Sequence, residues 1–205
     1  MREILGLAVL AWPQTLLVGM ALIFVVAIMV TLYFARNKKR AWPWVLGVSL
    51  LMYLAVFWDH IPTVVAHKYY CDKEAGFWVY KTVDQWKQEN PGVMETLVTN
   101  KGAPSTRQGD MQNFTDIYFL NQRINKVVKK TGSLPFNRWR WEHEVIDIQT
   151  GEVLARYVDF STGNGNISGA DSPVKFWLQR DHCNSGDLNY GHFLEFKDKF
   201  LGGRK

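Results

Sequence analysis

The chain of 205 residues has no Lys, Arg, Asp or Glu between Glu3 and Arg36, and none between Ala41 and Trp58. A water-soluble helix needs a polar face, so uncharged stretches of this length indicate segments that lie in lipid. About 20 helical residues cross a hydrocarbon core of roughly 30 Å. We therefore expect two transmembrane helices, at about 14–35 and 41–60, joined by the short cytoplasmic loop 36–40.

Cysteine is almost absent. The two cysteines, Cys71 and Cys183, are far apart and neither belongs to a C-x-x-C pair, so the pattern does not predict a zinc site or any other metal centre. If this part of the chain lies outside the cytoplasm, a Cys71–Cys183 disulfide is the natural interpretation. The alternative is two buried free thiols.

The sequence also lacks the short motifs of common enzymes. None of the five histidines belongs to an H-E-x-x-H pattern, and there are no repeats. The Gly- and Asn-rich segment 161–171 lacks the Lys-Ser/Thr of a phosphate-binding loop, so we interpret it as a surface loop. No motif resembles that of a known family, and the sequence predicts no catalytic residue, cofactor or metal.

Most of the net charge of +5 comes from one short segment, which contains Arg36, Lys38, Lys39 and Arg40. Because positive loops stay in the cytoplasm, this segment predicts that both termini and the C-terminal domain lie outside it. The cluster follows the first apolar stretch, whereas a cleaved signal peptide has its positive charge before that stretch. The rest of the chain is nearly balanced in charge, which argues against nucleic-acid binding.

The two compositions predict two domains, a membrane anchor over 1–66 and an extracytoplasmic domain over 67–205. The second domain contains strand-like runs, a capped helix and polar loops. The predicted strands are 76–80, 116–120, 123–128 and the two arms of a hairpin within 138–160. The predicted helices are 82–90 and 174–178, and the predicted loops include 100–112, 161–171 and 181–191. The fold class is therefore membrane-anchored α+β, with a two-helix transmembrane hairpin followed by a small domain. That domain has a mainly antiparallel β-sheet of about four or five strands and one or two short helices.

The hairpin within 138–160 is the clearest local pattern. Trp139, Trp141 and His143 alternate with charged residues, which is the period of a strand with one buried face, and Gly151 suits the turn. Aromatic side chains on one face either fill a core or line a ligand cleft. We take Trp139, Trp141 and His143 as a possible binding face.

These features predict a non-catalytic protein-binding module that is anchored in the bacterial inner membrane, with its C-terminal domain in the periplasm. Its partners would be the lipid bilayer and another envelope protein, for which it would serve as an accessory or inhibitory component. The partner and the oligomeric state stay open.

Two alternatives belong to other functional classes. The first is a small envelope enzyme, a hydrolase or a redox protein, and its candidate residues are Glu142, His143, Asp181, His182 and Cys183. The second is an envelope ligand sensor. The short loop 36–40 weakens the sensor hypothesis, because it leaves little protein in the cytoplasm to transmit a signal.

Overall fold

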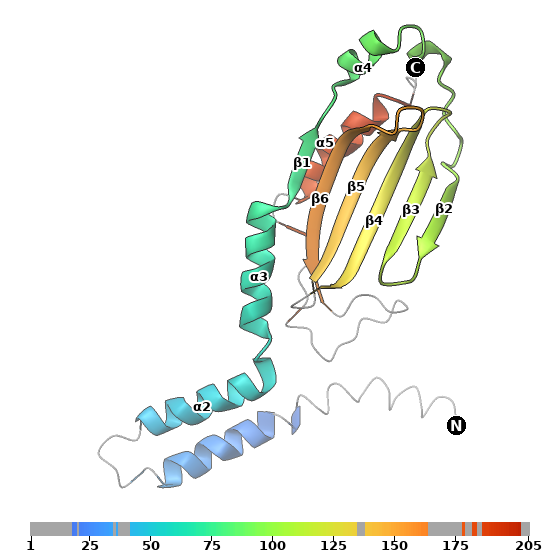
Figure 1. The fold of residues 1–205 in the computed structure, drawn as a ribbon. Coiled ribbons are helices and arrows are strands. Elements are labelled where there is room, and N and C mark those ends of the chain that lie inside the picture. Colours follow the sequence, from blue (N-terminus) through green and yellow to red (C-terminus); the bar gives the residue numbers. More distant parts are fainter. Residues whose placement is uncertain are drawn as a thin grey trace, which may run out of the picture. The chain divides into compact units, whose positions relative to one another are not determined.

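The computed structural model describes most of the chain, and Figure 1 shows its elements. The described residues are 18, 19, 21–34, 36, 42–134, 138–163, 178, 182, 183 and 186–201. Several predicted features lie outside them, namely Lys38, Lys39, Arg40, Asp181, residues 164–171 of the surface loop and most of the helix 174–178. The chain divides into two compact units, Met1–Ile61 and Pro62–Lys205.

The first unit contains the helices Ala21–Phe34 and α2 (Trp42–Phe57). No single helix among the described residues is both long and apolar enough to cross a membrane. The segments Trp42–Ala55 and His60–Lys73 meet the requirements of length and composition only together, as a bent pair. The predicted spans 14–35 and 41–60 therefore stay a prediction.

The second unit is built on one six-stranded antiparallel sheet with the strand order β1-β6-β5-β4-β3-β2. Its elements are α3 (His60–Lys73), β1 (Gly76–Val79), α4 (Val83–Glu89), η1 (Met94–Thr96), β2 (Ser105–Gly109), β3 (Phe114–Phe119), β4 (Ile124–Leu134), β5 (Arg138–Asp147), β6 (Val153–Thr162) and α5 (Gly186–Asp198). The α+β class and the antiparallel sheet are confirmed. The predicted number of strands was too low, because β2 lies in the segment 100–112, which was predicted to be a loop.

The predicted hairpin is formed by β5 and β6. Trp141 pairs with Asp159 and His143 pairs with Tyr157, so these four side chains lie on the same face of the sheet. At the turn, Gly151 has φ 73°, a conformation that glycine adopts without steric cost.

Helix α5 packs on this same face, against β1 and β6, and lies behind the sheet in Figure 1. Its Phe193 is fully buried beside the rings of His143 and Tyr157. The prediction of a loop over 181–191 was wrong for the residues from Gly186 onward, which are helical. Clustered aromatic residues in this segment find an apolar partner only in the folded sheet, which local sequence does not show.

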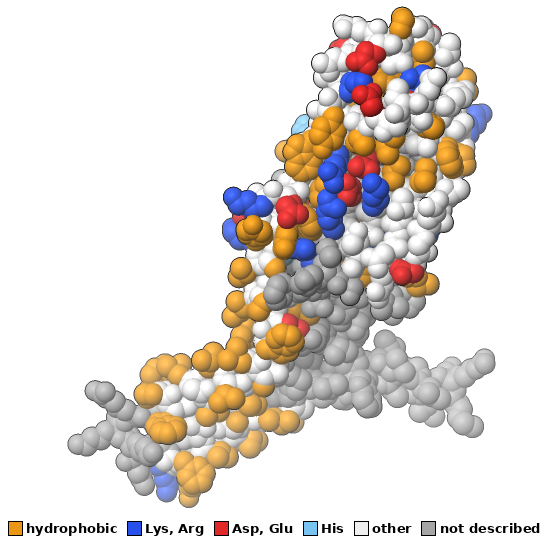
Figure 2. Space-filling model, viewed as in Figure 1, with side chains coloured by type: hydrophobic (Ala, Val, Ile, Leu, Met, Phe, Trp, Pro, Cys, Tyr) orange, Lys and Arg blue, Asp and Glu red, His pale blue; other side chains and the backbone are white. Residues whose placement is uncertain are grey.

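The opposite face of the sheet has a charged centre. Glu142 forms ion pairs with Arg140 and Arg156, and Glu144 pairs with Lys129 at 2.7 Å. Figure 2 shows this gathering of basic and acidic side chains on the face that Figure 1 presents. The two carboxylates are buried by these long side chains rather than by a second layer of backbone.

Helix α3 is joined to the segment at Cys183 by a disulfide and to the sheet by aromatic contacts. The sulfurs of Cys71 and Cys183 are 2.00 Å apart, with 5.4 Å between the Cα atoms, so the predicted pairing is present in the structure. Tyr70 packs against the ring of Phe160, and the Arg138 guanidinium lies 3.2 Å from the Tyr70 ring centroid.

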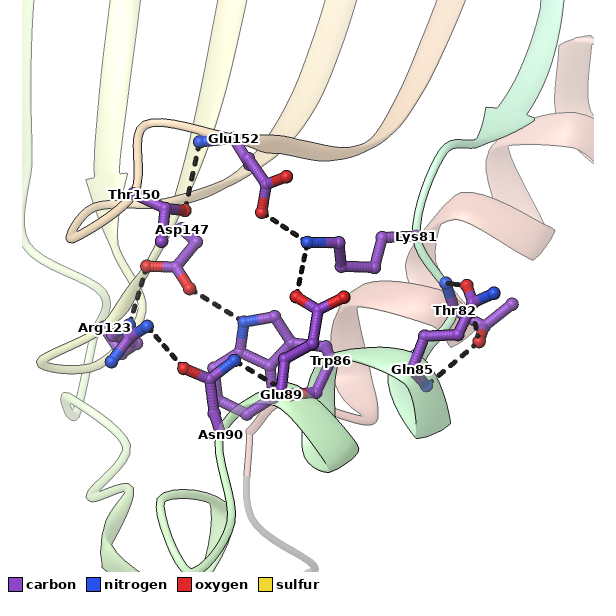
Figure 3. Close-up of polar contacts among 10 residues, drawn as sticks. All are labelled: Lys81, Thr82, Gln85, Trp86, Glu89, Asn90, Arg123, Asp147, Thr150 and Glu152. Carbon is purple, nitrogen blue, oxygen red and sulfur yellow. Dashed lines mark hydrogen bonds and ion pairs between the residues drawn. The ribbon is translucent and has the colours of Figure 1, made fainter.

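Helix α4 is attached at the other end of the sheet through Trp86, which is fully buried (Figure 3). The Trp86 Nε1–H donates to Asp147 at 2.8 Å, and Arg123 donates to the other carboxylate oxygen at 2.7 Å. Burial alone would raise the pKa of Asp147, but these two hydrogen bonds hold it below its ordinary value. The cap predicted for the helix 82–90 is confirmed, because the side chain of Thr82, its first residue, accepts from the Gln85 N–H.

Candidate binding pocket

A pocket of about 310 Å³ opens between the β5–β6 hairpin and α5. Its floor consists of the two cross-strand pairs named above, and Tyr190 of α5 and His182 complete the walls. The lining residues are Trp141, His143, Tyr157, Asp159, His182 and Tyr190. Four of these six side chains were not singled out as a binding face from the sequence, although all of them except Asp159 are aromatic or imidazole rings.

Asp159 is fully buried at the base of this pocket and accepts four hydrogen bonds. One carboxylate oxygen accepts from the Tyr157 hydroxyl at 2.9 Å and lies 2.5 Å from His182 Nδ1. The other accepts from the backbone N–H groups of Phe160 at 2.8 Å and Cys183 at 3.0 Å. Because all four contacts come from the protein itself, this carboxylate positions its neighbours and offers little to a ligand.

His182 is fixed at two points. Asp159 holds its Nδ1, and its chain neighbour Cys183 is bonded to Cys71. The side chain remains 56% exposed, which leaves the imidazole at the pocket and in contact with solvent. Local sequence could not reveal this pairing, since 23 positions separate the two partners.

His143 is largely enclosed by aromatic rings at the pocket. Its ring lies 5.3 Å from that of Tyr190 and 5.5 Å from that of Tyr157, centroid to centroid. Burial, assisted by the positive charge of Lys126, lowers its pKa to about 4. The imidazole is therefore neutral near pH 7, and its buried Nδ1 has no hydrogen-bond partner among the described residues.

Two lysines of β4 lie on the same sheet face and contact rings that line the pocket. Lys126 Nζ is 3.5 Å from the Tyr190 hydroxyl, and Lys130 Nζ is 4.9 Å from the Trp141 ring centroid. Burial lowers the pKa of both amines, that of Lys126 to about 8. Within the described ranges neither lysine forms an ion pair with a carboxylate. These cations were missed in the sequence, where they resembled ordinary surface charges.

The structure separates the predicted binding face into two parts. Trp141 and His143 line the pocket, whereas Trp139 does not. The Trp139 indole is buried next to Lys130, 4.3 Å from its Nζ, and its Nε1–H donates to the Gly163 carbonyl. Trp139 therefore supports the neighbouring surface rather than the pocket.

The residues considered for an enzyme do not form a single site. His143 and His182 meet at the pocket, but Glu142 lies on the opposite sheet face with its arginine partners. Cys183 is held in the disulfide and provides no nucleophilic thiolate.

His67 extends the surroundings of the disulfide. Its Nε2 lies 3.6 Å from the Cys71 sulfur and 3.2 Å from the Phe160 carbonyl oxygen. The ligand atoms of His67, Cys71 and Cys183 all lie within 4.8 Å of one another, a spacing that could hold a metal ion. Cysteine binds a metal ion as a thiolate, and the two disulfide-bonded sulfurs are not thiolates.

Comparison with known proteins gives no relative from which a function could be transferred. No protein-family description, curated protein or solved structure matches the chain.

Proposed function

We propose that this chain is a non-catalytic binding module that is anchored in the bacterial inner membrane. Its C-terminal domain would lie in the periplasm and would hold a segment of another envelope protein in the pocket between β5, β6 and α5. The observation that carries this proposal is the pocket itself. Five of its six lining side chains are aromatic or imidazole rings, and its one carboxylate is already saturated by the protein.

The composition of the first unit supports an anchor. Large apolar side chains are exposed around both of its described helices, including Leu22, Phe34, Trp42 and Leu51. Figure 2 shows hydrophobic side chains spread over the surface of these helices. Helices that are apolar on all sides need a non-aqueous environment. The predicted hairpin 14–35 and 41–60 would supply that environment by crossing the bilayer twice.

The charge cluster and the disulfide support the orientation. Arg36 and the basic residues up to Arg40 favour a cytoplasmic loop, which places both ends of the chain on the other side of the membrane. A disulfide persists in the oxidising periplasm and is rare in the reducing cytoplasm.

Labelling of Cys71 and Cys183 in intact cells tests this topology. A membrane-impermeant maleimide should react only after reduction by an impermeant reductant, since both sulfurs are bonded. The opposite result is that the thiols react only after cell lysis and stay unreactive when the protein is denatured in sealed right-side-out vesicles. That result would contradict the proposed orientation, because burial in the fold could not explain it.

Site-specific photocrosslinking in intact membranes tests the binding function. A benzophenone amino acid at His182 should capture a second protein, because this side chain lines the pocket and is exposed. The same group at Trp78 is the matched control, since Trp78 is also exposed but lies on the opposite sheet face. Capture of this chain alone, or equal capture from both positions, would contradict the proposal.

A second candidate is an envelope hydrolase, which the Asp159–His182 pair favours. A buried carboxylate on Nδ1 orients the imidazole, so that Nε2 is available as a general base. Hydrolysis of a substrate panel that disappears in His182→Ala, while the fold is retained, would favour this candidate over the binding module.

A further inference from the structure

We propose that the pocket binds an acidic segment of the partner protein, one in which carboxylates stand next to aromatic or apolar side chains. This inference rests on the proposed function and adds the chemistry of the partner. Its basis is the position of Lys126 and Lys130, which contact two different rings of the pocket lining.

Neither lysine pairs with a carboxylate of the described residues, so the two place positive charge at the edge of an aromatic surface. The Lys130 amine lies 4.3 Å from the Trp139 ring centroid, 4.9 Å from that of Trp141 and 5.8 Å from that of Phe114. The ring faces attract a cation but do not neutralise it. An anion that approached this surface would meet the ammonium group at the same place as apolar contacts.

Lys126 is in a similar position on the other side of Val128. It lies under Tyr190 and Phe193, and burial is the main cause of its lowered pKa. Asp198 is the acidic group that influences it, but that carboxylate is paired with Lys197 at 3.0 Å. A partly buried ammonium without an acidic partner costs folding free energy, so its retention is explained by a ligand that supplies the counter-charge.

Among the described lining residues, no carboxylate is free to compete with such a ligand. Asp159 is turned inward onto four protein donors. The Tyr190 hydroxyl accepts from Lys126 and keeps its own proton, which it can donate to a carboxylate. Rings in the lining accommodate the apolar part of the segment, and a pocket of about 310 Å³ is of the size of one or two side chains.

Neutralising variants of the full-length chain in detergent test the inference. Lys126→Gln/Lys130→Gln removes both cations, and Lys129→Gln is the matched control. Lys129 belongs to the same strand, but its side chain points to the opposite face and pairs with Glu144.

The probe is a short dye-labelled peptide of alternating aspartate and phenylalanine, with a lysine–phenylalanine peptide of the same length for comparison. The acidic peptide should bind at least about tenfold more tightly than the basic one, and each lysine removed should weaken it about tenfold. Binding should also fall as salt rises from about 50 to about 500 mM, because the cations are partly exposed to solvent. Lys129→Gln should leave the affinity unchanged.

Equal binding of the two peptides, or undiminished binding to the double variant, would overturn the inference. A third outcome would overturn it in favour of a lipid headgroup. In that case the parent chain binds no peptide, and the double variant loses the contact that the parent chain makes with nanodiscs rich in phosphatidylglycerol. Thermal unfolding shows whether the double variant is folded. Its melting temperature should be no lower than that of the parent chain if the lysines serve binding rather than stability.

Photocrosslinking separates this inference from the proposed function. The crosslinker at His182 could capture a partner equally well in the parent chain and in Lys126→Gln/Lys130→Gln. The proposed binding function would then be supported, and the inference of an acidic segment would be wrong. If no variant captures a second protein, the proposed function itself fails.

Discussion

Asp159 connects the sheet to the segment that carries His182 and Cys183, because its four hydrogen bonds come from both. Asp159→Asn preserves the shape but removes the charge and places an amide N–H₂ against existing donors. We expect a loss of about 2–4 kcal/mol in the free energy of unfolding, as for other buried charged hydrogen-bonded groups. Urea unfolding of the full chain in detergent, followed by near-UV circular dichroism, measures this loss.

The control for this substitution is Asp116→Asn. Asp116 is also buried, but its partner Arg107 is largely exposed, so the change should cost less than the substitution at Asp159. Equal unfolding midpoints for Asp159→Asn and the parent chain would show that the carboxylate does not hold the segment.

His143 predicts a dependence of stability on pH. Its pKa falls from an ordinary value of 6.5 to about 4 in the fold, so the unfolded chain binds more protons between these two values. The contribution of the neutral imidazole to the free energy of unfolding is fully present above pH 6.5. It is lost as the pH falls from 6.5 to about 4, and the total loss is about 3 kcal/mol. His143→Phe retains the ring contacts and cannot titrate.

The free energy of unfolding of the parent chain should therefore fall more steeply between pH 6.5 and 4 than that of His143→Phe. Because carboxylates titrate in both proteins, the difference between the two urea-unfolding series isolates the imidazole. Parallel series would contradict the burial of a neutral His143.

Helix α4 shows how one element depends on a single tertiary contact. Its seven residues are too few to be stable alone, so the buried Trp86 and its hydrogen bond to Asp147 should hold it in place. We expect Trp86→Phe to cost about 1–3 kcal/mol, because one buried oxygen of Asp147 loses its donor, and Trp86→Ala about 3–5 kcal/mol through the cavity.

The Thr82→Ala variant provides the comparison for α4, because it removes only the local cap and should cost about 1 kcal/mol. Hydrogen exchange of the α4 amides measures all three variants. If loss of the cap opened α4 more than loss of the tryptophan ring, local rather than tertiary interactions would dominate this helix.

Elements with a local signal were the ones that could be predicted. The β5–β6 hairpin follows from the alternation around Trp141 and a glycine turn, and α4 follows from the Thr82 cap. Strand β2 has no apolar alternation, and all five of its residues are exposed, so only its pairing with β3 defines it. For the same reason Trp141 and His143 were found from the sequence, whereas Asp159 and Lys126 gain their roles only from contacts across the fold.

At the scale of the whole molecule, the Cys71–Cys183 disulfide has two separable consequences. It closes a sequence separation of 112 residues, so the chain-entropy model predicts about 4–5 kcal/mol of stabilisation through the unfolded state. It also fixes Cys183, whose N–H donates to Asp159 and whose neighbour His182 lines the pocket. The first effect acts on all folded elements alike, whereas the second is local.

The double variant Cys71→Ser/Cys183→Ser, examined by hydrogen exchange in the full-length chain, distinguishes these effects. We expect a lower free energy of unfolding for the whole second unit. In addition, we expect amide exchange to increase more at position 183 and at the end of α3 than in β4 and β5. The local increase follows because neither segment would retain its covalent link, while the strands would keep their hydrogen-bonded neighbours on both sides. A uniform increase in exchange would mean that the disulfide acts only on the unfolded chain and that Asp159 alone holds the pocket wall.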